Sequence, residues 1–327
     1  GTVIPTLTAP SLGCSMGLIK TSLPREQASE RFERELFSHL QDEVGKRYGL
    51  FFNLLRLAGL KRREKKKYDL DYDELEHVIR NGEHDLRGIS LRGIVPKPAW
   101  IYGRHDIGYG FKGNHIVEIQ YVDEILDPER AAKWGIERDR VMIMYHGGGG
   151  TVPYYIGRFF GNRRKNTARQ RLIVGIGKIF FHLFSRDAPR RWRYYFRPRG
   201  HEAIPLDSRE GRRIMTAIKA AQNYAAHWNT AMCRRIIDAF HETAAGRNGA
   251  AEPVVAQLHN TIREEDGFVV HRHTVNRVRD GEPTILSGSK SSPSYLAVGL
   301  AGARKHLSSA DHGGGEKIER VVAALKE

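Results

Sequence analysis

Histidines stand in five short patches along the chain, four of which also hold glycine or asparagine, and these residue types can do metal and phosphate chemistry. The patches read GNH at 113–115, YHGGGG at 145–150, QLHN at 257–260, VVHRH at 269–273 and ADHGGGE at 310–316. A further patch, LGCS at 12–15, holds Cys14, one of two cysteines. Imidazole and thiolate bind divalent transition metals, and glycine lets backbone amides approach a phosphate closely. The combination indicates nucleotide chemistry.

Three of these histidines are expected at strand ends, where distant segments of a chain can converge on one metal. His115 begins a predicted strand, whereas His146 and His259 each end one. Cys14 would add a thiolate that can bridge two metals. The alternative is that each histidine caps a strand or is a satisfied polar core residue. For one histidine alone that alternative is favoured, but for the set we favour a metal site.

His312 is expected to act differently, because three glycines follow it. We expect its ring to be exposed over a loop of free amides at Gly313, Gly314 and Gly315. A nucleophilic ring nitrogen could attack phosphorus there while the amides stabilise the anionic oxygens. The stretch GSKSS at 288–292 could donate hydroxyls and amides to a triphosphate. The alternatives are a flexible C-terminal loop and a simple turn.

The elements that would position these residues mix helices and strands. Apolar spacing predicts helices within 24–60, over 70–82 and over about 211–245, the last with Asp207 and Glu210 as a capping box. Residues 92–113 are rich in Gly and Pro and indicate a loop. Strands are predicted at 115–125 and 140–146, in VVAQLH and FVVHRHTV, and before the loop in TILSGS. We therefore predict an α+β fold with a single domain over 1–327.

The formal net charge of +15 is concentrated in a basic segment at 157–200. This segment carries thirteen Lys and Arg residues against the single acid Asp187, and aromatic residues interleave with them. Basic side chains mixed with aromatics suit a nucleic-acid backbone with stacked bases. We expect the segment to be an insertion or flexible arm that holds RNA strands, and the alternative is a solvated face or flexible loop. The residues that we expect to bind RNA are Arg163, Arg164, Lys165, Arg190, Arg191 and Arg193.

The composition excludes some classes of protein. The sequence shows no apolar run long enough to span a membrane and no secretory signal. Two cysteines, Cys14 and Cys233, cannot make a disulfide framework. A reducing cytoplasm is the simpler interpretation, and it leaves a thiolate free to bind metal.

The ordered blocks of the chain resemble the RtcB-type RNA ligases. GFKGNHIVEIQYVDEI (110–125) is similar to the family's GSGNHFLEIQ, and IPLDSREGRRIMTAIKAAQNYAAHWN (204–229) is similar to its PIDSxEGxxYxxAMxxAxNYAxxN helix. Further blocks are QLHNTIREE, VVHRHTVNR, GEPTILSGSKSSPSYLAVG and DHGGGEKIER, and together they cover nearly the whole chain. The resemblance implies mixed β-sheets and flanking helices around a central metal and nucleotide site.

The resemblance also implies roles for individual residues. Cys14, His115, His146 and His259 would be manganese ligands, and His312 would take GMP covalently from GTP. The residues expected to line the nucleotide and metal pocket or to contact the triphosphate are Asn114, Glu118, Asn260, Ser287, Ser289, Gly313, Gly314 and Gly315. The implied reaction joins a 3′-phosphate or 2′,3′-cyclic phosphate RNA end to a 5′-hydroxyl end, as in tRNA splicing or RNA repair.

The chain departs from the family pattern at several positions. Ser11 stands for the aspartate of the family's DxxC motif, and His273 and Thr274 stand for a lysine and a glycine. Family arginines are replaced by Gly150, Thr230 and Glu316. The chain also ends at Glu327, before the family's terminal lysine, so we expect a fragment or a shortened, divergent member.

These departures leave two alternatives beside a ligase. One is a non-catalytic RNA-binding relative, and the other is a metal-dependent phosphodiesterase that opens cyclic phosphates. RNA is the expected partner in each case. The residues leave open whether an accessory activating protein is needed.

Overall fold

The computed structural model describes residues 1–8, 12–41, 67–107, 115–161, 168–196, 201–289, 291–315 and 317–318, and it confirms the predicted α+β fold. Its α-helices are α1 (Pro5–Thr8), α2 (Glu30–Gln41), α4 (Tyr72–Arg80), α5 (Lys97–Tyr102), α6 (Pro128–Trp134), α7 (Thr151–Phe160), α8 (Ala168–Leu183), α9 (Ala188–Tyr195) and α10 (Arg209–Glu242). The short 3₁₀ helices are η2 (Arg25–Gln27), η3 (Gly103–His105) and η4 (Ala301–His306). The strands are β1 (Thr2–Val3), β2 (Ser15–Pro24), β3 (Ile116–Tyr121), β4 (Arg140–Gly147), β5 (Ile204–Pro205), β6 (Ala251–Leu258), β7 (Thr261–Glu265), β8 (Phe268–Arg272), β9 (Val275–Arg277), β10 (Pro283–Leu286), β11 (Tyr295–Val298) and β12 (Ser309–Asp311).

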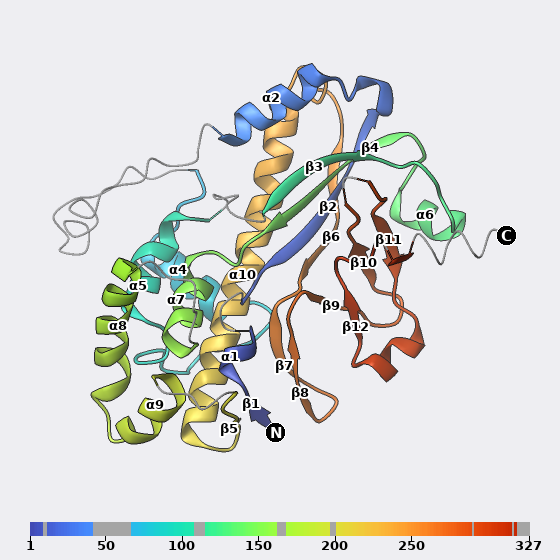
Figure 1. Ribbon diagram of the computed structural model, residues 1–327. Helices are drawn as coiled ribbons and strands as arrows, with labels where there is room; N and C mark the ends of the chain where they lie inside the picture. The colour runs from blue at the N-terminus through green and yellow to red at the C-terminus, as the bar shows by residue number, and fades with distance from the viewer. Residues whose placement is uncertain are drawn as a thin grey trace.

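A four-stranded antiparallel sheet forms the centre of the fold, with the order β3-β4-β2-β6 (Figure 1). β4 is buried from Val141 to Gly147, as its uninterrupted apolar run predicts. β2 separates β4 from β6, and Ser15 pairs with both Gly147 and Leu258. The ends of β4 and β6 therefore lie on either side of the start of β2, although more than a hundred residues separate them in the chain.

The two faces of this sheet are covered by different elements. Ile143 and Tyr145 point to one face and belong to the larger hydrophobic core, together with residues of α10 such as Trp228. Met142 and Met144 point to the other face and pack in a smaller core with Ile285 of β10. Because side chains alternate along a strand, His146 shares the second face with Met142 and Met144. It therefore faces the β-rich C-terminal part of the chain.

Helix α10 runs along the first face of the sheet (Figure 1). Its apolar positions recur every three to four residues, which is why one side of this 34-residue helix is almost continuously buried. The predicted capping box is wrong in its residues. Ser208 is the N-cap, and its hydroxyl accepts a hydrogen bond from the Gly211 amide at 2.9 Å. Glu210 is instead buried and paired with arginines, as described below.

Most of the described part of the basic segment is helical and packs on the rest of the fold, whereas its assignment as an insertion stays a prediction. It forms the end of α7, α8 and α9, which pack on one another and on α10. Lys178 of α8 is buried and donates to the carbonyl oxygens of Gly161 and Tyr195 at 3.1 and 3.0 Å. It thereby binds the carboxyl ends of α7 and α9.

Other predictions are confirmed or corrected in detail. The helix predicted at 70–82 is α4, capped by Asp71 and Glu74 in a capping box. The loop predicted at 92–113 is wrong in part, because α5 and η3 lie inside it. Of the helices predicted within 24–60, α2 is confirmed, whereas residues 42–60 lie outside the described part of the chain.

Three small antiparallel sheets build the C-terminal part: β7 with β8, β10 with β11, and β9 with β12. The predicted strand FVVHRHTV is two strands, because Thr274 between them has a φ of 62°. The pairing of β12 with β9 places the residue after β12, His312, beside Thr274, whose carbonyl accepts from the His312 amide at 3.3 Å. This pairing brings the C-terminal histidine to the end of the central sheet. Within the described ranges, no helix has both the length and the apolar character that a membrane span requires.

Candidate metal and nucleotide site

Three histidines from separate strands converge at one end of the central sheet. His146 lies in β4, His259 follows β6 and His312 follows β12. The Nε2 atoms of His146 and His259 are 3.2 Å apart. The ring of His312 lies 4.3 Å from that of His259 and 5.8 Å from that of His146, between centroids. Among the described residues these three offer ligand atoms within 4.8 Å of one another, so they can hold one metal ion.

The other two residues that the resemblance implies as ligands border this cluster. The ring of His115 lies 5.4 Å from that of His146, between centroids. Cys14 directly precedes β2, and its carbonyl accepts a hydrogen bond from the His259 amide at 2.9 Å. The structure thus gathers Cys14, His115, His146 and His259 around the end of the sheet. The trio with the closest ligand atoms includes His312, however, and not His115 or Cys14.

Burial keeps the imidazoles neutral, which is the form that binds metal. His259 is only 1% exposed, and burial, followed by its neighbours His312 and His146, lowers its pKa to about 2. Burial lowers the pKa of His115 to about 4, and it also lowers the pKa of His312. The Nδ1 atoms of these three rings are buried without a hydrogen-bond partner. Neutral rings whose ligand atoms lie this close to one another fit a bound cation.

The glycines after His146 allow the chain to pass close to its neighbours. A Cβ atom on Gly148 would lie 2.7 Å from Cε1 of His115, and one on Gly149 would lie 2.5 Å from the Leu12 carbonyl oxygen. Gly150 has a φ of 77°, and a Cβ there would lie 2.8 Å from both Tyr224 and Trp228. The side chain that the family carries at Gly150 could therefore not be restored without moving α10.

A buried carboxyl, which no sequence pattern indicated, fixes the helix that follows this glycine loop. Asp106 accepts hydrogen bonds from the hydroxyls of Thr151 and Tyr224, both at 2.5 Å. Burial raises its pKa to about 6. Asp106 lies in the segment predicted as a loop, and its two partners are distant in the chain. Only the tertiary structure connects them.

The loop around His312 differs from the expectation of free amides and an exposed ring. The amides of Gly313 and Gly314 donate to the side chain and backbone of Asp311, and the Gly315 amide donates to the Ser287 carbonyl oxygen. The His312 side chain is only 20% exposed. The predicted exposed ring and free amides are therefore both wrong in this structure, because the loop forms its own turn.

The predicted polar contacts are distributed unevenly around the cluster. Ser287 is adjacent, since its amide and hydroxyl both donate to the His312 carbonyl oxygen, at 2.6 and 3.0 Å. Ser289 instead forms a turn with Ser292. Asn260 is buried, and its side-chain oxygen accepts from the Thr274 amide at 2.6 Å. Glu118 pairs with Met144 across the sheet, on the face that His146 shares. Asn114 lies outside the described residues.

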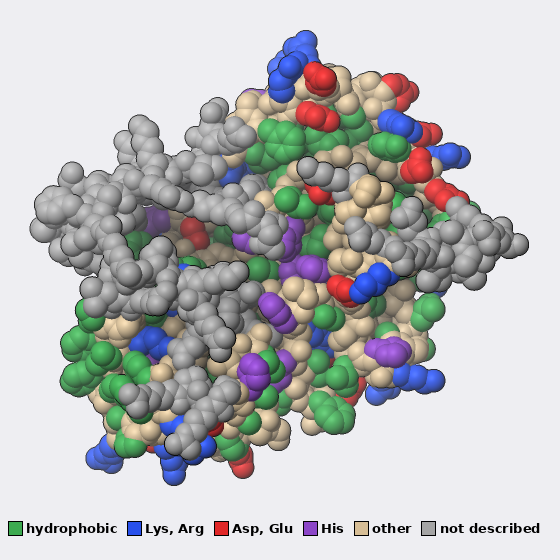
Figure 2. All heavy atoms as spheres, viewed as in Figure 1, with side chains coloured by type: hydrophobic (Ala, Val, Ile, Leu, Met, Phe, Trp, Pro, Cys, Tyr) green, Lys and Arg blue, Asp and Glu red, His purple; other side chains and the backbone are tan. Residues whose placement is uncertain are grey.

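The residues expected to bind RNA do not form one class. Arg191 is buried, and its Nε donates to Glu210 at 2.8 Å, so its assignment to RNA is wrong. Arg190 and Arg193 are exposed, and Arg193 pairs with Glu202. Near them Phe180 and Phe184 are 65% and 74% exposed and stack on one another. Figure 2, seen from the same side as Figure 1, shows apolar and basic side chains together at the lower left, where α8 and α9 lie. Arg163, Arg164 and Lys165 lie outside the described residues.

Thr274 carries backbone strain at the position where the family has glycine. Its φ of 62° is unfavourable for a β-branched residue. We expect Thr274→Gly to raise the free energy of unfolding by about 0.5–2 kcal/mol, since the released strain exceeds the entropy cost of glycine. Urea unfolding measures this change. Thr274→Ala keeps the Cβ atom, so its free energy of unfolding should rise little. An equal rise in both variants would show that backbone strain is not the cause.

These features define a candidate divalent-metal centre of buried neutral imidazoles in an α+β fold. A model of the RtcB family, described as tRNA-splicing ligase RtcB, matches residues 1–326. The chain therefore belongs to the RtcB family.

Individual relatives agree with this assignment. The chain is 24% identical over 371 residues to the tRNA-splicing ligase RtcB of Methanococcus maripaludis, which covers 99% of this chain and 69% of that relative. It is 25% identical to the protein of the same name from Archaeoglobus fulgidus, covering 100% of this chain and 69% of the relative. For the Pyrococcus horikoshii protein the identity is 26%, covering 95% of this chain and 36% of the relative. The chain thus spans only part of each relative.

Proposed function

We propose that the chain is an RNA ligase that joins a 3′-phosphate or 2′,3′-cyclic phosphate RNA end to a 5′-hydroxyl end, with GTP as nucleotide donor and manganese as metal. The convergence of His146, His259 and His312 within 4.8 Å carries this proposal. It supplies nitrogen ligands and a nucleophile in one place, in a chain of the RtcB family. Cys14 and Cys233 do not form a disulfide with one another, which suits a reducing compartment such as the cytoplasm.

The cluster fits a manganese ion through imidazole nitrogens that lie within 4.8 Å of one another. His146 and His259 would hold the ion, with Cys14 and His115 as the bordering ligands that the resemblance adds. When bound, manganese would polarise phosphoryl oxygens as a Lewis acid. The protein contributes neutral rings, whose lone pairs are available because burial keeps protons off them.

His312 would act as the nucleophile toward GTP. A ring nitrogen would form a bond to the α-phosphorus while the bond to the leaving diphosphate breaks. The carboxylate of Asp311, 3.8 Å from Nδ1 of His312, would stabilise the positive charge that the ring gains. An RNA 3′-phosphate oxygen would next displace His312 from that phosphorus. The 5′-hydroxyl oxygen would then attack the RNA 3′-phosphorus, lose its proton and release GMP.

Exposed cations on α9 would bind the RNA strands. Arg190 and Arg193 on α9, near the stacked pair Phe180 and Phe184, offer charge together with aromatic surface. Such surfaces bind single strands by phosphate contacts and base stacking. This role needs no contribution from Arg191, which is occupied inside the fold.

The ligation assay tests the proposal. With GTP, manganese and two RNA fragments carrying a cyclic phosphate and a 5′-hydroxyl, the protein should yield a joined strand, visible on a denaturing gel. His312→Ala should lose at least about a thousandfold in rate, as removal of a covalent nucleophile does. His306→Ala, which removes an exposed histidine of η4, is the matched control and should ligate normally.

The same gel distinguishes the alternatives. Conversion of cyclic phosphate to 3′-phosphate without joining would indicate the phosphodiesterase. RNA binding without any chemistry would indicate the non-catalytic relative. Either result with a folded protein would overturn the ligase proposal.

A further inference from the structure

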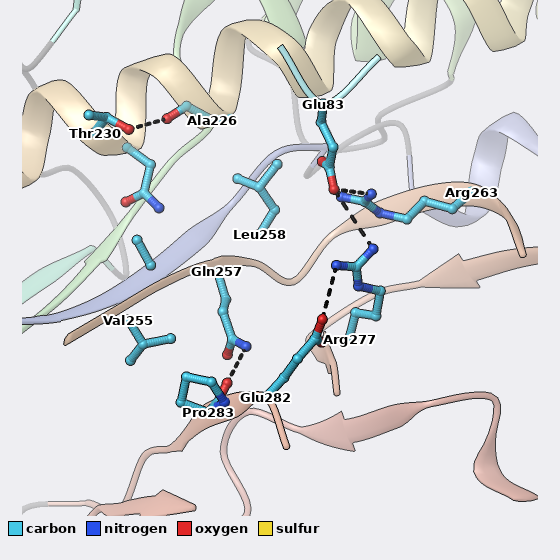
Figure 3. A pocket seen from close by; sticks show the side chains of 12 residues that line it. Glu83, Ala226, Thr230, Val255, Gln257, Leu258, Arg263, Arg277, Glu282 and Pro283 are labelled. Atoms are coloured by element: carbon cyan, nitrogen blue, oxygen red, sulfur yellow. Dashed lines mark hydrogen bonds and ion pairs between the residues drawn. The ribbon is translucent and has the colours of Figure 1, made fainter. Parts of the chain in front are cut away.

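A pocket of about 470 Å³ lies beside the histidine cluster, between α10, β6 and the strands that follow (Figure 3). Its size falls within the range of small-molecule sites. Gln257 and Leu258 of β6 form part of its wall, and His259 follows them directly in the chain. Figure 3 shows Arg263 and Arg277 on one side and Gln257 with Val255 on the other. The pocket is therefore adjacent to the proposed metal centre but distinct from it.

Two amide oxygens in the pocket wall have no hydrogen-bond partner. Asn229 is only 3% exposed, and its Oδ1 is buried and unpaired. Gln257 donates through Nε2 to the Pro283 carbonyl oxygen at 2.6 Å, which fixes its amide and leaves Oε1 unpaired. Unpaired buried acceptors cost free energy, so a ligand that donates to them would be stabilised. The pocket thus calls for a ligand with at least two N–H donors.

The opposite side of the pocket offers donors. The guanidinium of Arg277 stands 3.8 Å from both Glu83 and Glu282, beyond hydrogen-bond length. Its planar fork can therefore turn toward a ligand. Arg263 differs, because both of its terminal nitrogens are bound by Glu83, although its Nε is buried without a partner.

The charges of the lining residues decide between an anion and a neutral ligand. Two carboxylates, Glu83 and Glu282, balance two guanidiniums, Arg263 and Arg277. A phosphate would meet both carboxylates and the two unpaired amide oxygens, which repel it. A neutral, planar, polar group instead uses donors and acceptors at once. The pocket therefore favours a nucleobase over a phosphate.

We propose that this pocket binds one guanine base of the RNA strand. The O6 and N7 acceptors of guanine match the fork of an arginine such as Arg277. Its N1–H and N2–H groups are the donors that the oxygens of Asn229 and Gln257 lack. Adenine presents an acceptor at N1 and no amino group at position 2, and uracil has a single ring N–H for the two oxygens. That the base belongs to an RNA strand rests on the proposed function.

Thr230 gives a way to close the pocket without touching its polar groups. Its exposed side chain lines the wall, and its hydroxyl is bonded only locally, to the Ala226 carbonyl oxygen (Figure 3). An arginine at this position would extend a long side chain into the cavity. Thr230→Arg should therefore block base binding while Arg277, Asn229 and Gln257 remain.

The experiment measures the affinity of short single-stranded RNAs by fluorescence anisotropy, without GTP or manganese. The probes are oligouridylates that carry one guanosine at successive positions, compared with pure oligouridylate. We expect about tenfold tighter binding when the guanosine occupies one position, which is the scale of one bidentate base contact. Arg277→Lys keeps the charge but loses the fork, so it should abolish this preference. Arg279→Lys, on an exposed neighbour, is the matched control.

The outcomes separate this proposal from the ligase proposal. Loss of the guanosine preference in both Arg277→Lys and Thr230→Arg, with Arg279→Lys unaffected, supports the base pocket even if ligation fails. No preference at any position would overturn it even if ligation succeeds. A preference that survives in either variant, with unchanged melting temperatures, would also overturn it, because the base would then bind elsewhere.

Discussion

Replacing His259 by alanine is expected to abolish metal binding and ligation together. His259 is almost fully buried, and its Nε2 lies 3.2 Å from that of His146 and its ring centroid 4.3 Å from that of His312. Removing this ring takes away the ligand that lies closest to both His146 and His312. We expect the affinity for Mn²⁺ to fall by at least about a hundredfold, since even residues that only orient metal ligands contribute ten- to hundredfold. Isothermal titration calorimetry measures the affinity directly.

The control for this variant is His77→Ala, which removes an exposed imidazole from α4. It should bind Mn²⁺ as the unmodified protein does. If His259→Ala kept its affinity for Mn²⁺ while remaining folded, the metal would have to be held by other groups. The assignment of the cluster would then be wrong.

Replacing Glu210 by alanine is expected to give the largest loss of stability. Its carboxylate accepts from Arg191 Nε at 2.8 Å, from Arg213 at 2.6 Å and from the Tyr195 hydroxyl at 2.7 Å. All four side chains are buried. Without the carboxylate, two buried guanidiniums would lose their closest counter-charge, at a cost of about 3–5 kcal/mol in the free energy of unfolding.

Urea unfolding monitored by circular dichroism measures this loss. Asp187→Ala is the matched control, because Asp187 is 26% exposed and lies 3.8 Å from the same Arg191. A partly exposed pair contributes about 1 kcal/mol or less. Equal losses in the two variants would show that burial of the network does not determine its contribution.

Local patterns predicted the elements that are most regular. The apolar run VMIMY is followed by a histidine, and it forms the buried strand β4 with His146 at its end. The apolar spacing from Ile214 to Phe240 predicted α10, because a long helix needs one continuous buried side. The N-cap was predicted one residue away from Ser208. Such an error is expected, since Asp207 and Ser208 are both good caps and only the backbone direction selects between them.

Other elements depend on tertiary contacts that local patterns do not contain. β2 was not predicted, because SMGLIKTSLP mixes glycine, serine, lysine and proline; it is a strand because β4 and β6 pair with it on both sides. The basic segment was predicted as an arm for a similar reason. The charge of Arg191 indicated solvent, and the partner that keeps it buried, Glu210, lies on another helix.

The candidate site was predicted from residue types rather than from geometry. Histidines beside glycine or asparagine identified His146, His259 and His312, and the structure places these three together. The internal hydrogen bonds of the glycine loop after His312 were not foreseen, because a glycine run does not reveal that Asp311 and Ser287 accept its amides. The role of Asp106 behind the other glycine loop was equally invisible in the sequence.

The departures from the family pattern have visible structural consequences. Gly150 is enclosed by Tyr224 and Trp228, and Thr230 borders an open pocket. The resemblance implies arginine at both positions, and this chain carries no cation at either of them.

Anomalous scattering from a crystal grown with Mn²⁺ would show whether the histidine cluster binds a metal ion. We predict a manganese peak within bonding distance of the Nε2 atoms of His146 and His259, at roughly 2.0–2.3 Å, with His312 adjacent. Figure 2 shows several histidine side chains near the middle of the visible face. A manganese peak elsewhere in the protein, with His146 and His259 still hydrogen-bonded to one another, would show that these histidines are not the metal ligands.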